Sequence, residues 1–350
     1  MKTNYLHPNF KLSGKSFKDK DVLLAFAETN YSEIVSFLQN WFDDSLHVSV
    51  NTSGSTGKPK SIPLQKKHMI HSAKATGKIF DLQENASTLL CLPINFIAGK
   101  MMLIRAITLG WHLDIVPPSK NPLKNIEKEY DFSAMTPMQV FYSLKYMSKI
   151  KKIIIGGGTI SEEIQHKITE VPTKMYATYG MTETCTHIAI KPVNKAAGVN
   201  FKVNIFKALP NVFFTKDDRD CLIIEAPKVS NALLVTNDLV VLVSDTQFKW
   251  LGRADNIINS GGFKLIPEQI ELKIANLVKL PFFVAGVPDA ILGSKLILII
   301  EGNSFCLKPE SFQEILGKIE IPKNIYFTKT FVRTKTNKIN RKESLLLVEM

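Results

Sequence analysis

A loop rich in glycine, hydroxyl groups and lysine occupies residues 51–60, directly after an alternating, strand-like stretch at residues 46–50. Its sequence, NTSGSTGKPK, holds two glycines, four hydroxyl side chains and two lysines. Glycines let backbone N–H groups converge on an anion, hydroxyls donate further hydrogen bonds, and lysine supplies positive charge. A Walker A loop is excluded, because Thr52 stands where glycine is required and Pro59 follows Lys58. The loop predicts a polyphosphate site, against the alternative of a flexible surface loop.

A strand-like run at residues 153–155 ends in a second glycine-rich turn at residues 156–158. Thr159 and Glu162 then predict a capping box for a following helix. The turn does not match GxGxxG, so a dinucleotide fingerprint is not supported. It predicts a tight connection from strand to helix.

Residues 179–184, with the sequence YGMTET, combine three useful side chains. The ring of Tyr179 can stack on a base, and the Thr182 hydroxyl can bind a phosphate. Glu183 is an oxygen ligand suited to Mg²⁺, which takes few carboxylates together with substrate phosphates. The alternative interpretation is a turn with a surface acid.

Together these segments resemble the acyl-adenylate-forming superfamily of acyl-CoA synthetases, peptide-synthetase adenylation domains and firefly-type luciferases. Further motifs of that family follow in its order: TND at 236–238, GRAD at 252–255, SGGFK at 260–264 and TNKINR at 336–341. The resemblance covers residues 46–345. It implies ATP, Mg²⁺ and coenzyme A as cofactors and a small-molecule carboxylic acid as substrate.

The resemblance also implies a role for each motif residue. Lys338 is implied to bridge the substrate carboxylate and the α-phosphate, Asp238 to accept ribose hydroxyls, and Arg253 to hold ribose or phosphate. Asp255 is the implied pivot between two domains. The other implied catalytic residues are Thr182 and Glu183, with Glu183 as the metal ligand. The implied nucleotide- and CoA-binding residues are also Thr52, Ser53, Gly54, Ser55, Thr56, Gly57, Lys60, Gly157, Gly158, Tyr179, Gly180, Met181, Gly261, Gly262 and Lys264.

Two motif glycines of the family are asparagine in this chain, at Asn237 and Asn337. Asparagine also tolerates a left-handed backbone, which is the expected reason that it replaces glycine at Asn237. A degenerate nucleotide-binding homologue is therefore an alternative to an active enzyme. Retention of four functional residues argues against it: Glu183, Asp238, Arg253 and Lys338.

The segment CLPINFIAG at residues 91–99 stands where many relatives have LPLFHxxG, with Phe96 in place of histidine. Arg105 follows Gly99 by six residues, and a basic residue there resembles the o-succinylbenzoate–CoA ligases of menaquinone biosynthesis. Their substrate has two carboxylates, so a cation is needed for the one that does not react. Lys100 is a second candidate. It lies about 140° from Arg105 on an ideal helix, so only one of them is expected to face the pocket.

The implied substrate-binding residues are Phe96, Gly99, Lys100, Arg105 and Gly156. A solvated helix face is the alternative for both cations, and another aromatic, fatty or amino acid is the alternative for the substrate. No protein nucleophile is required for such a ligase.

The elements that position these motifs alternate along the chain, which favours an α/β fold with βαβ units and a mostly parallel sheet. Ser32 is predicted to cap an amphipathic helix, whose predicted buried face is Ile34, Val35, Leu38, Trp41 and Phe42. Strands are expected at 46–50, 87–92, 111–116, 131–135 and 152–155, and helices at 66–80, 98–109 and 138–147.

After residue 200 short β runs dominate, and a second, smaller α+β pattern follows, with helices expected at 267–277 and 309–319. We expect an N-terminal ATP- and acid-binding domain at 1–252, a hinge at 253–256 and a mobile lid domain at 257–350.

The composition is that of a globular protein: 350 residues, 45% apolar and 22% charged. The four cysteines lie too far apart for a disulfide framework or a zinc site, and buried free thiols are expected. The net charge of +12 raises nucleic acid as an alternative partner, but the basic residues are spread along the chain and no nucleic-acid partner is predicted. We expect neither a secretory leader nor a membrane span, a cytoplasmic location, and a homodimer as one form of assembly.

Overall fold

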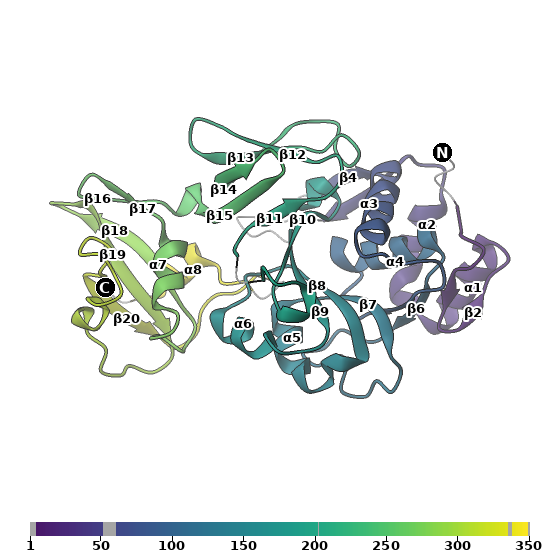
Figure 1. The fold of residues 1–350 in the computed structure, drawn as a ribbon, viewed down its shortest axis with the longest axis horizontal. Helices are drawn as coiled ribbons and strands as arrows, with labels where there is room; N and C mark the ends of the chain where they lie inside the picture. The colour runs from purple at the N-terminus through teal and green to yellow at the C-terminus, as the bar shows by residue number, and fades with distance from the viewer. Residues whose placement is uncertain (1–4, 52–60, 202, 335–337, 349–350) are drawn as a thin grey trace.

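The computed structural model describes residues 5–51, 61–201, 203–334 and 338–348. Within these residues the strands form a 13-stranded sheet, a five-stranded sheet and a separate two-stranded hairpin. Figure 1 shows the five-stranded sheet at one end of an elongated molecule and the N-terminal helices at the other. No helix in this part of the chain combines the length and apolarity that crossing a membrane requires.

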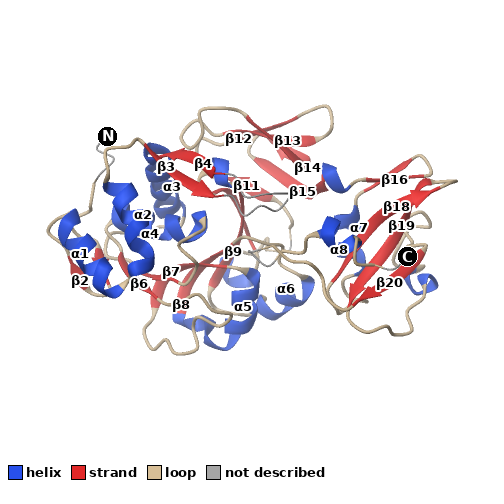
Figure 2. Ribbon diagram, turned by 180° about the vertical axis from the view of Figure 1, so that it is seen from behind, coloured by secondary structure: helices blue, strands red, loops and turns tan. Residues whose placement is uncertain are grey.

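One half of the large sheet is parallel and carries helices on both faces (Figures 1 and 2). Its strands, in spatial order, are β1 (Lys11–Leu12), β6 (His112–Ile115), β5 (Ser87–Leu90), β7 (Tyr130–Met135), β8 (Ile150–Ile155) and β9 (Lys174–Gly180), and its helices are α3 (Lys66–Ile79), α4 (Ile97–Leu109), α5 (Pro137–Ser143) and α6 (Glu162–Ile168). Alternate residues of β8 separate the faces, because Ile154 joins the core under α3 and α4 whereas Ile153 and Ile155 join the core under α5 and α6. The predicted α/β fold is confirmed.

The other half of the large sheet is antiparallel. It continues from β9 through β10 (His187–Pro192), β11 (Phe206–Ala208), β15 (Gln247–Arg253), β14 (Leu234–Ser244), β13 (Cys221–Glu225) and β12 (Phe213–Lys216), while β2 (Lys15–Ser16) closes the opposite edge. The sheet as a whole is thus mixed.

The strand expected at 46–50 lies outside the large sheet. It is β3 (His47–Asn51), and it pairs antiparallel with β4 (Ser61–Gln65). Asn51 and Ser61, which flank the predicted phosphate loop, are paired partners in this hairpin.

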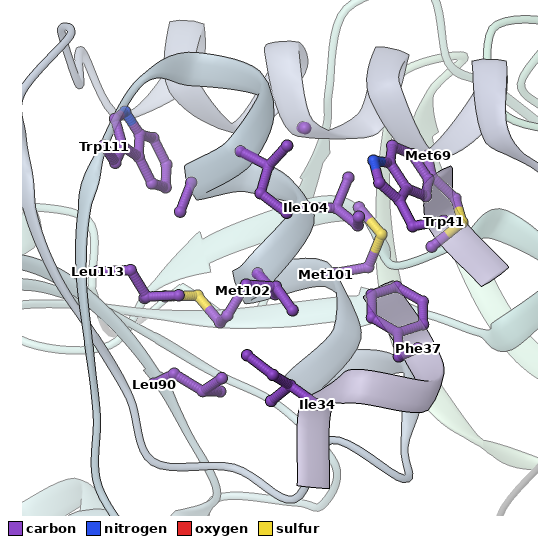
Figure 3. Close-up of a cluster of buried hydrophobic side chains, with 14 of the residues drawn as sticks. Ile34, Phe37, Trp41, Met69, Leu90, Met101, Met102, Ile104, Trp111 and Leu113 are labelled. Carbon is purple, nitrogen blue, oxygen red and sulfur yellow. The ribbon is translucent and has the colours of Figure 1, made fainter. Parts of the chain in front are cut away.

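The N-terminal helices α1 (Lys20–Asn30) and α2 (Ser32–Phe42) pack on one another and against α3 and α4. Figure 3 shows Phe37 and Trp41 beside Met69 and Met101 in this core. The predicted buried face of α2 holds except for Val35, which is only half-buried, while the buried Phe37 was missed. The predicted cap is also wrong, because Ser32 is the first helical residue and the N-cap is Tyr31.

The smaller sheet begins after η4 (Ala254–Asn256), a single 3-10 turn that links it to β15. It consists of β16 (Ile258–Ser260), β17 (Phe263–Leu265), β18 (Phe282–Asp289), β19 (Gly293–Glu301) and β20 (Asn324–Thr328), with α7 (Pro267–Ile274) and α8 (Arg341–Leu345). The helix expected at 309–319 is wrong. The 3-10 turn η5 (Pro309–Phe312) forms there instead. Phe312 and Leu316 are the side chains of this segment that are buried in the core of the smaller sheet, so little apolar packing holds a longer helix in place.

The four cysteines are free, and three of them are buried. Cys306 is exposed, so the expectation of buried thiols is wrong at that position.

A charged pair fixes the segment that carries Lys338. Arg341 donates from both terminal nitrogens to the two carboxylate oxygens of Glu271, each at 2.7 Å, and Val284 N donates to Glu271 Oε1 at 2.8 Å. Burial raises the pKa of Glu271 even though Arg341 opposes that shift. The pair ties α8 to α7, three residues beyond Lys338.

We expect Arg341→Leu to lower the free energy of unfolding by about 2–3 kcal/mol, because it leaves the Glu271 carboxylate buried without its partner. Urea unfolding followed by circular dichroism measures the loss. The double variant Glu271→Leu/Arg341→Leu is the matched control and should recover much of it. Equal losses in the single and double variants would contradict this role for the pair.

Candidate active site

The carboxyl ends of the parallel strands β7, β8 and β9 lie at one edge of the sheet, and ligands bind at this edge in open α/β sheets. The glycine turn at 156–158 follows β8 there. A Cβ on Gly156 would lie 2.8 Å from Thr178 Oγ1, and Gly157 has a φ of +80°, so both positions favour glycine. The helix after the turn is capped by Ser161, whose side chain accepts from Ile164 N. The capping box predicted from Thr159 is therefore wrong.

Three predicted nucleotide-binding residues come together beside this edge. Tyr179 donates its hydroxyl to Asp238 Oδ2 at 2.6 Å, and Arg253 Nη1 lies 3.6 Å from Asp238 Oδ1. Trp250, which sequence reasoning missed, donates from Nε1 to Asp238 Oδ1 at 3.1 Å. Burial, and then Asp238, raise the pKa of Tyr179 well above its ordinary value. A carboxylate between aromatic rings and a guanidinium suits a nucleoside, with its hydroxyls on the acid and its base on a ring.

Lys338 lies between β20 and α8, and the charges of the same cluster act on it. Lys338 N donates to Thr334 Oγ1 at 3.1 Å, and Thr334 N donates to Lys338 O at 2.8 Å. The side chain stays exposed to solvent, yet surrounding protein, and then the charge of Arg253, lower the pKa of its ammonium, while Asp238 raises it. Lys338 is thus close enough to both charges for each to act on it.

The motif that contains Glu183 lies at the start of the antiparallel half. Gly180 ends β9, and a Cβ there would be 2.3 Å from Thr186 O, so only glycine fits. Met181 precedes the 3-10 turn η2 (Thr182–Thr184), and its N–H donates to Thr184 Oγ1 at 3.0 Å. Thr182 and Glu183 are half-buried on that turn, and β4 packs beside it.

The Glu183 carboxylate has no hydrogen-bond or ion-pair partner within the described ranges, so its oxygens remain available as ligands. No cluster of three His, Cys, Asp or Glu side chains that could hold a metal occurs in those ranges either. A single free carboxylate fits Mg²⁺, which takes most of its remaining ligands from water and phosphate. The predicted phosphate-binding residues lie outside the described residues: Thr52, Ser53, Gly54, Ser55, Thr56, Gly57 and Lys60.

Asp255, the predicted pivot, is held on both sides. Asn237 Nδ2 donates to Asp255 Oδ1 at 3.0 Å, and Arg253 Nη2 donates to Asp255 Oδ2 at 2.8 Å. Arg219 in turn donates to Asn237 Oδ1 at 3.1 Å. The expected left-handed backbone at Asn237 is wrong, because the residue lies within β14 and its φ is not positive. Its side chain, not its backbone, distinguishes it from glycine.

The predicted CoA-binding turn lies elsewhere. Gly261 and Gly262 have φ values of +56° and +83° in the turn between β16 and β17, and Lys264 follows in β17. Gly261 N donates to Leu292 O at 2.9 Å, so this turn packs on the turn between β18 and β19. The structure does not bring these residues to Asp238.

Arg105 is the most deeply buried charge near the site, at 1% exposure. Its Nε donates to Thr76 Oγ1 at 3.2 Å and its Nη2 to Thr186 Oγ1 at 3.1 Å. No Asp or Glu of the described chain lies within ion-pair distance of it. Burial lowers the pKa of Arg105 to about 9. Because Thr186 lies three residues after Glu183, Arg105 faces the segment that carries the metal-ligand candidate.

Lys100 points in a different direction from Arg105. Its ammonium donates to Ile94 O at 2.8 Å and lies 5.2 Å from the centre of the Phe37 ring. Gly99 is required by close approach, since a Cβ would lie 2.3 Å from Pro93 O. Phe96 is the N-cap of α4 and is half-buried. Thr76, Thr186 and the buried His187 are contacts of this region to which sequence reasoning assigned no role.

Comparison with known proteins agrees with this geometry. The family model described as AMP-binding enzyme matches residues 27–205, just over half of the chain. A crystal structure of an acyl-CoA synthetase (AMP-forming)/AMP-acid ligase II-like protein from Dyadobacter fermentans is 34% identical, with a TM-score of 0.60. That match covers 90% of this chain and 93% of the other.

Two further relatives carry more specific names. A 2-succinylbenzoate–CoA ligase from Bacillus cereus is 24% identical, and the match covers 97% of this chain and 78% of the relative. The structure of o-succinylbenzoate coenzyme A synthetase from Bacillus subtilis in complex with ATP and magnesium ion has a TM-score of 0.74 at 18% identity, covering 93% of this chain and 82% of that one. At that identity the second likeness shows the fold.

Proposed function

The chain belongs to the AMP-binding enzyme family, and on that basis we propose that it joins a carboxylic acid to coenzyme A with cleavage of ATP to AMP and pyrophosphate. We propose o-succinylbenzoate as the acid, which would place the enzyme in menaquinone biosynthesis. Relatives named 2-succinylbenzoate–CoA ligase support this choice. A cytoplasmic location and a homodimer remain predictions.

The observation that carries the proposal is the Tyr179–Asp238–Arg253 cluster, with Lys338 near enough for the charges of Asp238 and Arg253 to act on its ammonium. In the first step, one carboxylate oxygen of the acid attacks the α-phosphorus of ATP, the bond to pyrophosphate breaks, and acyl-AMP forms. Negative charge builds on the α-phosphate oxygens, and the Lys338 ammonium is placed to stabilise it. Bound Mg²⁺ would offset phosphate charge, with Glu183 as its protein ligand.

In the second step, the thiolate of coenzyme A attacks the acyl carbon, and AMP leaves with the bridging oxygen. We propose that the smaller domain, at 257–350, turns about Asp255 in the hinge at 253–256 relative to the larger domain at 1–252. This turn would withdraw Lys338 and bring Gly261, Gly262 and Lys264 to the acyl-AMP. The observed arrangement, with Lys338 at the cluster and the glycine turn away from it, supports assigning this conformation to the first step.

Arg105 supports a substrate with a second carboxylate. A buried guanidinium without an acidic partner is costly, and an anionic substrate would supply the missing charge. A fatty acid or a simple aromatic acid leaves it uncompensated.

Pyrophosphate release with ATP, Mg²⁺ and a panel of acids tests the proposal. The panel contains o-succinylbenzoate, benzoate, a medium-chain fatty acid and several amino acids, each with and without coenzyme A. Turnover with o-succinylbenzoate alone, completed by coenzyme A, is expected. Turnover with another acid would support the ligase reaction but refute o-succinylbenzoate as the substrate. No pyrophosphate release with any acid, together with intact ATP binding, would favour a degenerate nucleotide-binding protein.

The bond between Asn237 and the pivot yields a further prediction. Asn237→Gly removes the hydrogen bond that holds Asp255 in the observed arrangement, so we expect the rotated arrangement to become more populated. A lost hydrogen bond of about 1 kcal/mol corresponds to roughly a fivefold shift. We therefore expect thioester formation from supplied acyl-AMP to accelerate by up to about fivefold, measured by stopped-flow, with adenylation unchanged or slower.

Asn85→Gly, at an exposed asparagine with positive φ in the turn between α3 and β5, is the control and should leave both steps unchanged. A slower second step in Asn237→Gly would contradict the idea that the hydrogen bond from Asn237 to Asp255 holds back the domain rotation.

A further inference from the structure

His187 lies beside Arg105, and its ring holds a buried nitrogen without a hydrogen-bond partner among the described residues. Its side chain is 4% exposed, and no hydrogen-bond partner for its Nε2 exists among the described residues. Its Nδ1 lies 3.4 Å from Thr186 Oγ1, the oxygen to which Arg105 also donates. Burial, and then the charge of Arg105, lower the pKa of His187 well below its ordinary value. The imidazole is therefore neutral at pH 7.

Thr186 links the two buried groups, since its hydroxyl contacts both the Arg105 guanidinium and the His187 ring. Arg105 can only donate, so one lone pair of Thr186 Oγ1 accepts from it, and the Thr186 hydroxyl can then either donate to His187 Nδ1 or accept from it. A neutral imidazole that accepts at Nδ1 carries its proton on Nε2. In that tautomer the unpartnered Nε2 is an N–H donor beside a guanidinium that also only donates, and an anion in the adjoining space would select it. A buried group of donors with a positive charge calls for an anion.

A cavity adjoins this donor. His187 lines a pocket of about 290 Å³ between α3 and the segments that follow β11 and β13. Ser72 of α3 is also in its wall, and the exposed Lys74, Lys78 and Lys228 contribute to its rim. The volume is at the lower end of small-molecule sites, and three lysines raise the local positive potential that draws anions in.

We propose that His187 is a specificity-determining residue of the acid site, whose Nε2–H donates to the non-reacting carboxylate of the substrate beside the Arg105 guanidinium. The inference rests on the proposed function, because it adds a residue to the site for the same acid. An acid without the second carboxylate would leave His187 Nε2 unpaired and the Arg105 guanidinium without a counter-charge in the core. The site would therefore reject such an acid, in the way that polar sites reject analogues lacking the matching group.

Two variants separate the donor from the shape of the ring. His187→Phe keeps a planar ring and removes the donor, whereas His187→Gln keeps a donor on a side chain of similar reach. Binding is measured by calorimetry with o-succinylbenzoate and with the monoacid in which hydrogen replaces the non-reacting carboxylate. His187→Phe should weaken binding of o-succinylbenzoate by about 10–100-fold, the value of a hydrogen bond to a charged group. Monoacid binding should stay within about twofold, and His187→Gln should restore most of the difference.

Kinetics and circular dichroism complete the test. In pyrophosphate release, the KM for o-succinylbenzoate should rise in His187→Phe with little change in kcat, and the spectrum of the variant should match that of the wild type. Unchanged binding, or equal loss for both acids, would overturn the proposal while the ligase activity stands. If the wild type binds o-succinylbenzoate through His187 but releases no pyrophosphate, the subsite stands and the proposed function fails. Binding of neither acid by the wild type would overturn the subsite.

Discussion

Replacing Lys338 with alanine should slow acyl-AMP formation by about 10²–10³-fold, the usual cost of removing one group that stabilises transition-state charge. Lys338 is the lysine that the smaller sheet brings within the influence of Asp238 and Arg253. Its ammonium is expected to act on the α-phosphate only while charge is transferred there. The loss should therefore fall on kcat for pyrophosphate release, with a small change in the KM for ATP.

The second half-reaction provides the internal control. Thioester formation from supplied acyl-AMP should stay within about threefold of the wild type in Lys338→Ala, because this step does not use the ammonium. Lys342→Ala is the matched control variant, since it removes an exposed lysine from α8 on the same segment and should leave both steps intact. Equal loss of both steps in Lys338→Ala would count against two arrangements of the domains.

Arg105→Met should stabilise the protein and weaken its use of the acid at the same time. In the protein without substrate, the guanidinium is buried, and its hydrogen-bond partners in the part of the chain that the structure describes are two threonine hydroxyls. An apolar side chain of similar length removes that desolvation cost, so the free energy of unfolding should rise by about 1–4 kcal/mol. Loss of a charged hydrogen bond to the substrate should lower kcat/KM for o-succinylbenzoate by about 10–100-fold.

Chemical denaturation and pyrophosphate release measure the two effects on one preparation. Lys100→Met is the control, because Lys100 lies on the same helix but binds Ile94 O and the Phe37 ring. It should leave the KM for the acid within about twofold of the wild type. A selective rise in KM for Lys100→Met, with none for Arg105→Met, would assign the carboxylate to the other cation. Destabilisation by Arg105→Met would show that the core does not carry an uncompensated charge.

The motif residues could be located from the sequence because their short motifs resemble those of a known family and occur in the same order. Tyr179 and Arg253 stand at the ends of β9 and β15, and their convergence on Asp238 follows from the order of strands in one sheet. Trp250 could not be found in this way. Its contact with Asp238 depends on the antiparallel register of β14 and β15, which contains shifts that no local pattern indicates.

The surroundings of Arg105 were equally hidden. Thr76 and Thr186 are 29 and 81 residues away in sequence, and only the packing of α3 on α4 and the placement of β10 bring them together. At Asn237 the error was of another kind. The sequence predicted a left-handed backbone from a local rule, whereas the structure shows that the side chain donates a hydrogen bond to Asp255, 18 residues away. Local patterns predict elements, but contacts across elements decide the site.

Isotope transfer tests the central claim, that this chain activates a carboxylate as its adenylate. The acid is supplied with ¹⁸O in its carboxylates, together with ATP, Mg²⁺ and coenzyme A, and the products are analysed by mass spectrometry. If acyl-AMP is the intermediate, one ¹⁸O from the acid must appear in AMP and none in pyrophosphate, because the bridging oxygen leaves with AMP when the thiolate attacks. Label in inorganic phosphate alongside ADP would show activation as an acyl phosphate and contradict the account.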